Sequence, residues 1–410
     1  MMMKASRALL MSLLLAALIP GCNSTTVKTT TQTPVQPEVA GPVPESMLLD
    51  VGVNLFKPGT EGLTDKELEL IYPEVRQAEA RYFPTVLATT LQNTGSWGVV
   101  RVIPDRQSEM DLFVDGVILQ SDGEFLKLAI NVQDSSGKTW FTRTYEEEAS
   151  KYAYDKELSK SIEPFQGLYN RIASDMAAFR SQVTPAQVGT LRTISELRFA
   201  ERFAPEVYSG YLVKDGKERY SIARLPAEND PLMERLRRIR ERDNLFVDTL
   251  QDYYSTFAAK MRSPYLQWRQ ESYSEIHQLR ETRGSATRRT LGGVAAIAAS
   301  IAAIYFGANS NNPGLGTLGT MGGLVGIGAG AMLVKSGLDR NAEAKLHLES
   351  LKEIAASLDA DIQPHRMELE DRTVTLSGSV DQQYAQWREI LQEIYRTETG
   401  VMPDPAPANN

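Results

Sequence analysis

The sequence predicts an α+β fold, with an N-terminal mixed sheet-and-helix domain, a long helical stalk that carries a Gly/Ala-rich helical hairpin, and a small C-terminal α/β element. Three observations lead to this prediction. Short runs of alternating apolar and polar residues, separated by Gly-containing turns, occupy residues 47–182. Apolar residues then recur at helical spacing from residue 231 onward. Finally, residues 290–334 include no Asp, Glu, Lys or Arg.

The N-terminal domain is expected to combine strands and helices. Hairpin turns are indicated by SDG at residues 121–123 and by SSG at residues 135–137. The TDKE motif at residues 64–67 has the pattern of a capping box, and Pro73 is suited to the first turn of a helix. Strands are expected at residues 48–55, 97–103, 112–120, 125–133 and 139–146, and a closing helix at residues 163–183.

Three short motifs in this domain carry a resemblance to a known family. They are VNLF at residues 53–56, DLFVDG at residues 111–116 and DSSG at residues 134–137. Together with the order of elements, they resemble the periplasmic domain of the curli-secretion and penicillin-binding-protein-activator lipoproteins. The resemblance implies a non-enzymatic assembly or secretion role. The membrane-spanning hairpins of the curli channel have no counterpart in this chain, so its pore is not implied.

The middle of the chain is expected to be helical. Thr184, Pro185 and Gln187 form a capping-box pattern that begins one helix, and Asp230 followed by Pro231 begins a longer one. A hairpin is expected at residues 208–224, and Ser263-Pro264 is expected to interrupt the long helix. The long helix carries a heptad-like apolar seam typical of coiled coils, made of Leu232, Leu236, Ile239, Phe246, Leu250, Tyr253 and Phe257.

Charged residues line another part of this helix. Arg237, Arg238, Arg240 and Arg242 interleave with Glu234, Glu241 and Asp243. This pattern favours a solvated face with local ion pairs over a nucleic-acid site.

The uncharged stretch 290–334 predicts two apolar helices joined at an Asn/Pro/Gly turn. Small residues recur at every fourth position, which gives a flat helix face that allows close packing, as in a glycine zipper. These candidate self-association or membrane residues are Ala295, Ala299, Ala303, Gly307, Gly322, Gly326 and Gly330. The alternative is a hairpin buried at the centre of a soluble helical bundle.

The N-terminus predicts a secretory signal peptide, because basic Lys4 and Arg7 precede an apolar run. It ends in LIPGC at residues 18–22, which resembles the bacterial lipobox. That resemblance implies that Cys22, the one cysteine in the chain, becomes the lipid-bearing first residue of the mature protein. Asn23 and Ser24 follow in place of the Asp that family rules associate with inner-membrane retention, which favours an outer-membrane address facing the periplasm.

The C-terminal region is expected to contain two strands, 362–369 and 372–380, followed by a helix with Trp387, Leu391 and Tyr395 on one side. RTVTLSGSV at residues 372–380 resembles a strand of the BON domain, a small periplasmic fold. The resemblance implies attachment to membranes or partners.

Composition and residue types argue against several functions. A net charge of −8 and a pI near 5.3 disfavour a nucleic-acid partner. The histidines, His277, His347 and His365, have no metal-ligand or triad spacing. Glu146-Glu147-Glu148 is a candidate cation site, but edge protection of a strand explains it better. We therefore expect no catalytic residues, no metal and no cofactor.

These observations lead to a functional hypothesis: a self-associating outer-membrane lipoprotein that assists cell-envelope assembly or secretion, binds an unknown periplasmic partner, and is not an enzyme. The alternatives are a membrane-inserting, pore-like oligomer and a periplasmic binding module that activates an envelope synthase. The expected division of the chain is 1–21 signal peptide, 22–46 lipidated Cys and tether, 47–182 α+β domain, 183–289 helical region, 290–334 hairpin, 335–360 return helix, 361–400 BON-like tail and 401–410 disordered.

Overall fold

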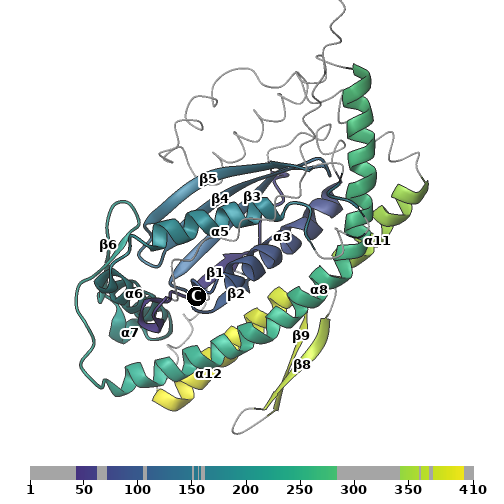
Figure 1. Cartoon of the computed structure of the whole chain (residues 1–410). Helices are drawn as coiled ribbons and strands as arrows, with labels where there is room; N and C mark the ends of the chain where they lie inside the picture. The colour runs from purple at the N-terminus through teal and green to yellow at the C-terminus, as the bar shows by residue number, and fades with distance from the viewer. Residues whose placement is uncertain are drawn as a thin grey trace, which may run out of the picture.

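The structure is a computed structural model of the whole chain (Figure 1). It describes residues 43–61, 72–104, 109–149, 152–155, 157, 162–283, 342–359, 362–368 and 373–400. Several expectations lie outside these residues. They are the signal peptide with Cys22, most of the tether, the capping box at 64–67, the hairpin at 290–334 with its seven small residues, the start of the return helix and the disordered end at 401–410.

A five-stranded mixed sheet forms the N-terminal part, in the order β2-β1-β3-β4-β5. β1 (Val51–Asn54) is parallel to both β2 (Val100–Ile103) and β3 (Leu112–Ser121). β4 (Phe125–Asp134) and β5 (Thr139–Glu148) continue β3 as an antiparallel meander. The expected α+β class is confirmed.

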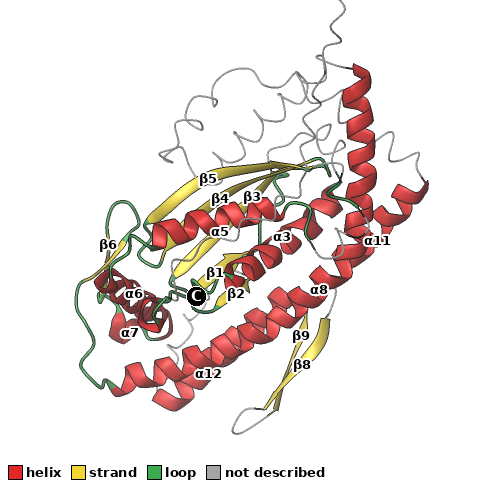
Figure 2. Ribbon diagram, in the orientation of Figure 1, coloured by secondary structure: helices red, strands yellow, loops and turns green. Residues whose placement is uncertain are grey.

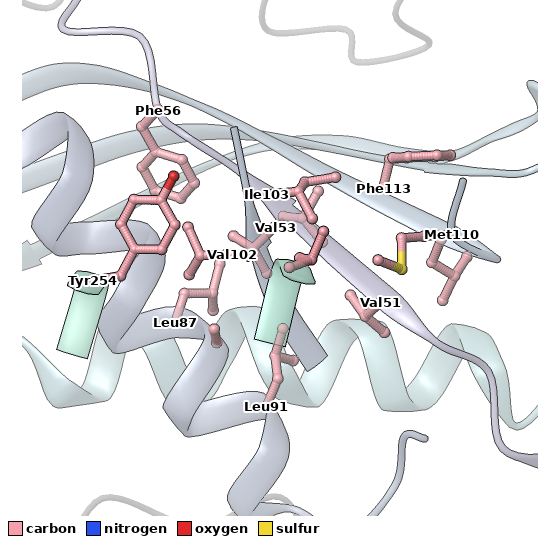
Figure 3. Close-up of a cluster of buried hydrophobic side chains, with 14 of the residues drawn as sticks. Val51, Val53, Phe56, Leu87, Leu91, Val102, Ile103, Met110, Phe113 and Tyr254 are labelled. Atoms are coloured by element: carbon pink, nitrogen blue, oxygen red, sulfur yellow. The ribbon is translucent and has the colours of Figure 1, made fainter. Parts of the chain in front are cut away.

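Two helices cover one face of this sheet (Figure 1). α3 (Pro73–Asn93) begins at the expected proline and connects β1 to β2, and α5 (Gln166–Arg180) packs on β5. We refer to β1–β5 with α3 and α5 as the sheet unit. Figure 3 shows Leu87 and Leu91 of α3 pointing toward Val53 and Val102, and all four side chains are buried.

The helical middle begins with α6 (Pro185–Phe203), where Thr184 and Gln187 form the expected capping box. The short helix α7 (Pro205–Tyr208) leads into a hairpin of β6 (Leu212–Lys214) and β7 (Tyr220–Ile222), as expected for residues 208–224.

The long helix α8 (Pro231–Arg283) is confirmed, and Asp230 Oδ1 accepts hydrogen bonds from the backbone N–H groups of Leu232 and Met233 at its start. The expected interruption at Ser263-Pro264 is wrong, because α8 continues through Pro264. Proline there removes one backbone donor, and buried side chains on both sides hold the helix together. Figure 2 shows that α8 changes direction along its length, as an interior proline causes.

The long helix packs along the sheet unit instead of standing apart from it. It contacts α3 and β2, and Tyr254 of α8 lies among the buried side chains in Figure 3. One continuous hydrophobic core therefore includes side chains from the sheet unit, α6, α8 and the C-terminal helices.

The C-terminal region also packs on α8. α11 (Ala342–Asp359) contacts α8 and α3, and it is followed by a hairpin of β8 (Ile362–Glu368) and β9 (Thr373–Gly378). α12 (Val380–Thr399) lies against α8, and its Trp387 ring is 5.3 Å from the ring of Phe246. The two expected strands and the expected helix are thus present. Among the described helices, none combines the length and the apolar character needed to cross a membrane.

Candidate functional site

The residues that the sequence analysis selected as sites, Cys22 and the seven small residues of 290–334, lie outside the described part of the chain. The structure contains a cluster of buried ionisable groups where α8 contacts the sheet unit, and we consider this cluster as the candidate site. We call this cluster the α8 junction. Its members are Arg76, Glu79 and Tyr82 of α3, Ser121 of β3, Glu163 before α5, and Tyr265 and Arg269 of α8.

Glu79 is one of the two carboxyl groups at the centre of the junction, and its side chain is fully buried. Its Oε1 accepts hydrogen bonds from Ser121 Oγ at 2.6 Å and from Tyr265 Oη at 2.5 Å. Its Oε2 is 3.7 Å from Arg76 Nε. Burial raises the pKa of Glu79, and the nearby Arg76 charge opposes this shift only in part.

Glu163 is the second carboxyl group, and it joins α8 to α3. Its Oε1 accepts a hydrogen bond from Arg269 Nη1 at 2.6 Å, and its Oε2 accepts one from Tyr82 Oη at 2.9 Å. The Arg269 guanidinium also lies 4.1 Å from the centroid of the Tyr265 ring. An arginine in this position forms an ion pair and a cation–π contact at once.

The turn between β3 and β4 fits closely against α8 at the same place. A Cβ added to Gly123 would lie 2.4 Å from the backbone oxygen of Arg269, and Gly123 has a φ of +84°. The Tyr154 hydroxyl donates a hydrogen bond to the Gly123 carbonyl. Glycine is therefore required here both by the backbone conformation and by the close approach of the helix.

A second buried cluster holds the start of α8. The carboxylate of Glu109 is buried beside Arg198 and Arg202 of α6, with Arg198 Nε 3.2 Å from Oε2. Arg240 of α8 donates to the backbone oxygen of Glu109 at 2.8 Å and to Ser195 Oγ at 2.7 Å. Burial raises the pKa of Glu109 despite its arginine neighbours.

The expectation of a solvated charged face with local ion pairs on α8 is therefore only partly correct. Arg237 pairs with Glu234 three residues before it, and with Glu196 of α6. Asp243, in contrast, is buried and accepts a hydrogen bond from Arg388 of α12 at 2.7 Å. Non-local packing decides which of these charges is exposed, and the local sequence pattern carries no information on it.

Four of the other candidate residues make structural contacts. Lys127 Nζ is 2.8 Å from the Glu146 carboxylate, and Glu147 lies beside Arg171, where burial raises the pKa of Glu147. His277 stacks on Tyr273, and the His365 ring is 5.8 Å from the Phe246 ring. Within the residues that the structure describes, no group of three His, Cys, Asp or Glu side chains could hold a metal ion.

The α8 junction was not predicted from the sequence, although one signal was available. Arg76 and Glu79 interrupt an otherwise apolar stripe on α3, and Arg269 does so on α8 beside Tyr265 and Trp268. A charged residue on an apolar helix face predicts either that the charge has a buried partner or that the apolar face has been wrongly assigned. The arrangement is suited to fixing α8 against the sheet unit, because each carboxylate accepts hydrogen bonds from two different elements.

Comparisons with protein-family models, with curated proteins and with solved structures gave no match for this chain. The fold thus defines it as an α+β protein whose long helix is fixed to a mixed sheet.

Proposed function

We propose that this protein is an outer-membrane lipoprotein with a non-catalytic role in cell-envelope assembly or secretion. In this proposal the lipid on Cys22 fixes its location, the sheet unit binds a periplasmic partner, and residues 290–334 associate with further copies of the chain. The LIPGC sequence and the small residues at every fourth position support the proposal.

One structural observation supports the assembly role most directly. The two helices that border residues 284–341 in the sequence, α8 and α11, pack on each other and contribute buried side chains to the same core as the sheet unit. Leu348 and Leu351 are the buried α11 residues in that core. Because these two helices share a core, both ends of the segment are connected to the folded part of the chain from which it would contact other copies.

The lipid anchor is tested by Cys22→Ser in cells, followed by membrane fractionation. We expect the variant to leave the membrane fraction and to appear in the soluble periplasmic fraction, because it lacks the acylated cysteine. Retention of the variant in the membrane would contradict a lipid anchor and would favour direct insertion by residues 290–334.

Self-association is tested by Gly326→Leu in the full chain, with molar mass measured by light scattering. We expect a smaller assembly, since leucine would hold the packed helices apart. Gly189→Leu is the matched control, because Gly189 lies on α6 with no atom near its Cβ position. If Gly326→Leu forms the same oligomer as the wild type, the proposed packing is overturned. A wild type that associates only in detergent would favour a pore-like oligomer. A monomeric wild type would favour a binding module that activates an envelope synthase.

A further inference from the structure

We propose that α8 is a helix of two limbs, and that its distal limb opens from the sheet unit while its proximal limb stays attached. The proximal limb is residues 231–263 and the distal limb is residues 265–283, with Pro264 as the hinge.

The hinge follows from the chemistry of proline. Pro264 has no N–H, so the carbonyl of Lys260 lacks the hydrogen bond that continues the helical ladder. The two limbs are therefore coupled by one backbone hydrogen bond fewer than neighbouring turns, at the position where bends in helices usually occur. Figure 1 shows the two ends of α8 running in different directions.

The two limbs differ in how many apolar side chains hold them, although the proximal limb also carries the buried Asp243–Arg388 pair. Apart from Asp243, the buried residues of the proximal limb are apolar or aromatic. These nine residues are Met233, Leu236, Ile239, Phe246, Val247, Leu250, Tyr254, Phe257 and Met261. The distal limb buries Arg269 and Ser272 beside Tyr265, Trp268 and Ile276. Exposing apolar surface to water costs free energy in proportion to its area, and hydration of that surface does not offset the cost.

Moving a limb away from the sheet unit costs less free energy where the buried groups are ionic, because water solvates these groups again. Arg269, Glu163 and Glu79 each lost hydration on burial, and each regains it when the limb moves away. In the described residues, the buried Nε and Nη2 atoms of Arg269, Nη1 of Arg76 and Oγ of Ser272 have no hydrogen-bond partner. Asp243 Oδ1 on the proximal limb is in the same state, but the distal limb holds more such atoms, and these lower the free-energy cost of opening it.

The docked position of the distal limb on the sheet unit is nevertheless specific. The Gly123 turn admits the Arg269 backbone only in one position, and Tyr265 reaches Glu79 only when the limb is docked. The α8 junction therefore defines a docked state and an open state, and not a continuous range of positions.

The test is amide hydrogen exchange of the full chain, followed by peptide along α8. We expect amides of residues 265–277 to exchange at least tenfold faster than those of residues 236–261. Arg269→Met leaves Glu163 buried without its cation, so distal exchange should rise at least tenfold further while proximal exchange stays unchanged. Pro264→Ala restores the hydrogen bond to the Lys260 carbonyl, so it should slow distal exchange.

Two matched variants keep the test decisive. Asp248→Asn removes the ion pair between Asp248 and Arg101 on the proximal limb, and it should leave distal exchange unchanged. Tyr265→Phe removes only the hydroxyl that bonds to Glu79, so it is the variant to use if Arg269→Met fails to fold. Equal exchange along the whole of α8, or an equal rise in both limbs with Arg269→Met or Tyr265→Phe, would overturn the proposal.

Discussion

Gln251 of α8 pairs its side-chain amide with both backbone polar groups of Val102 on β2. Gln251 Oε1 accepts from the Val102 N–H at 2.8 Å, and Gln251 Nε2 donates to the Val102 carbonyl at 2.9 Å. Gln92 of α3 similarly accepts from the Val100 N–H at 3.0 Å. β2 lies at the edge of the sheet, where unpaired backbone groups are open to another strand. Glutamine side chains therefore occupy this edge in place of a further strand.

Gln251→Ala is expected to lower the free energy of unfolding by about 1–3 kcal/mol, because the Val102 N–H and carbonyl lose their partners at a partly buried position. Denaturation by urea measures this loss. Gln270→Ala is the control, since Gln270 is exposed on the same helix and should change the free energy by less than about 0.5 kcal/mol. Equal effects of the two substitutions would show that Gln251 contributes nothing at the sheet edge.

Gly123→Ala is expected to destabilise the protein by at least about 2 kcal/mol. An alanine with a φ of +84° is strained by about 1–2 kcal/mol, and its Cβ would also displace the Arg269 backbone. Gly189→Ala, in the interior of α6 with open space at its Cβ position, should instead stabilise by about 0.5–1 kcal/mol. Thermal or urea denaturation of the two variants separates them, and a neutral Gly123→Ala would contradict the close fit of the turn on α8.

Asp111 is expected to make stability fall as the pH rises. Burial raises the pKa of Asp111 from 3.8 to about 6, and the N–H of Asp50, which donates to Oδ2 at 3.0 Å, opposes the shift only in part. The folded state therefore binds the proton more tightly than the unfolded state. The resulting stabilisation is complete below about pH 4 and is lost as the pH rises to about 6 and above, by about 3 kcal/mol.

The measurement compares the free energy of unfolding of the wild type and Asp111→Asn at pH 4 and at pH 7.5. Asparagine keeps an oxygen for the Asp50 N–H but does not ionise, so the variant should gain stability relative to the wild type at the higher pH. Glu79, Glu109 and Asp243 have pKa values that burial raises in the same direction, and they are present in both proteins. A difference that does not change with pH would contradict the raised pKa of Asp111.

Local patterns in the sequence were enough to predict most elements of the fold. Alternation and Gly-containing turns located β3, β4 and β5, because Gly123 and Gly137 both adopt the positive φ that their turns need. Thr184 and Gln187 predicted the start of α6 through a capping box, which depends on neighbouring residues alone.

What the sequence did not predict depends on contacts between distant positions. The Arg269–Glu163 pair spans 106 residues, and Gln251 is 149 residues from Val102. Neither spacing leaves a periodic signal. Pro264 was predicted to interrupt α8 because its local effect was considered without the buried side chains that flank it. The buried charges of the α8 junction interrupt apolar helix faces, but the partners that bury them lie far along the chain and could not be identified from the sequence.

The C-terminal helix is expected to unfold together with α8, because the buried pair of Arg388 and Asp243 joins them. Arg388→Met leaves the Asp243 carboxylate buried without its cation, which should cost about 3–5 kcal/mol in a single unfolding transition. Arg242→Met removes a more exposed pair with Glu398 and should cost less than about 1 kcal/mol. Urea denaturation followed by fluorescence and by circular dichroism measures both. A separate early transition for Arg388→Met would mean that α12 folds as its own unit, whereas coincident transitions follow from the continuous core that Phe246 and Trp387 share.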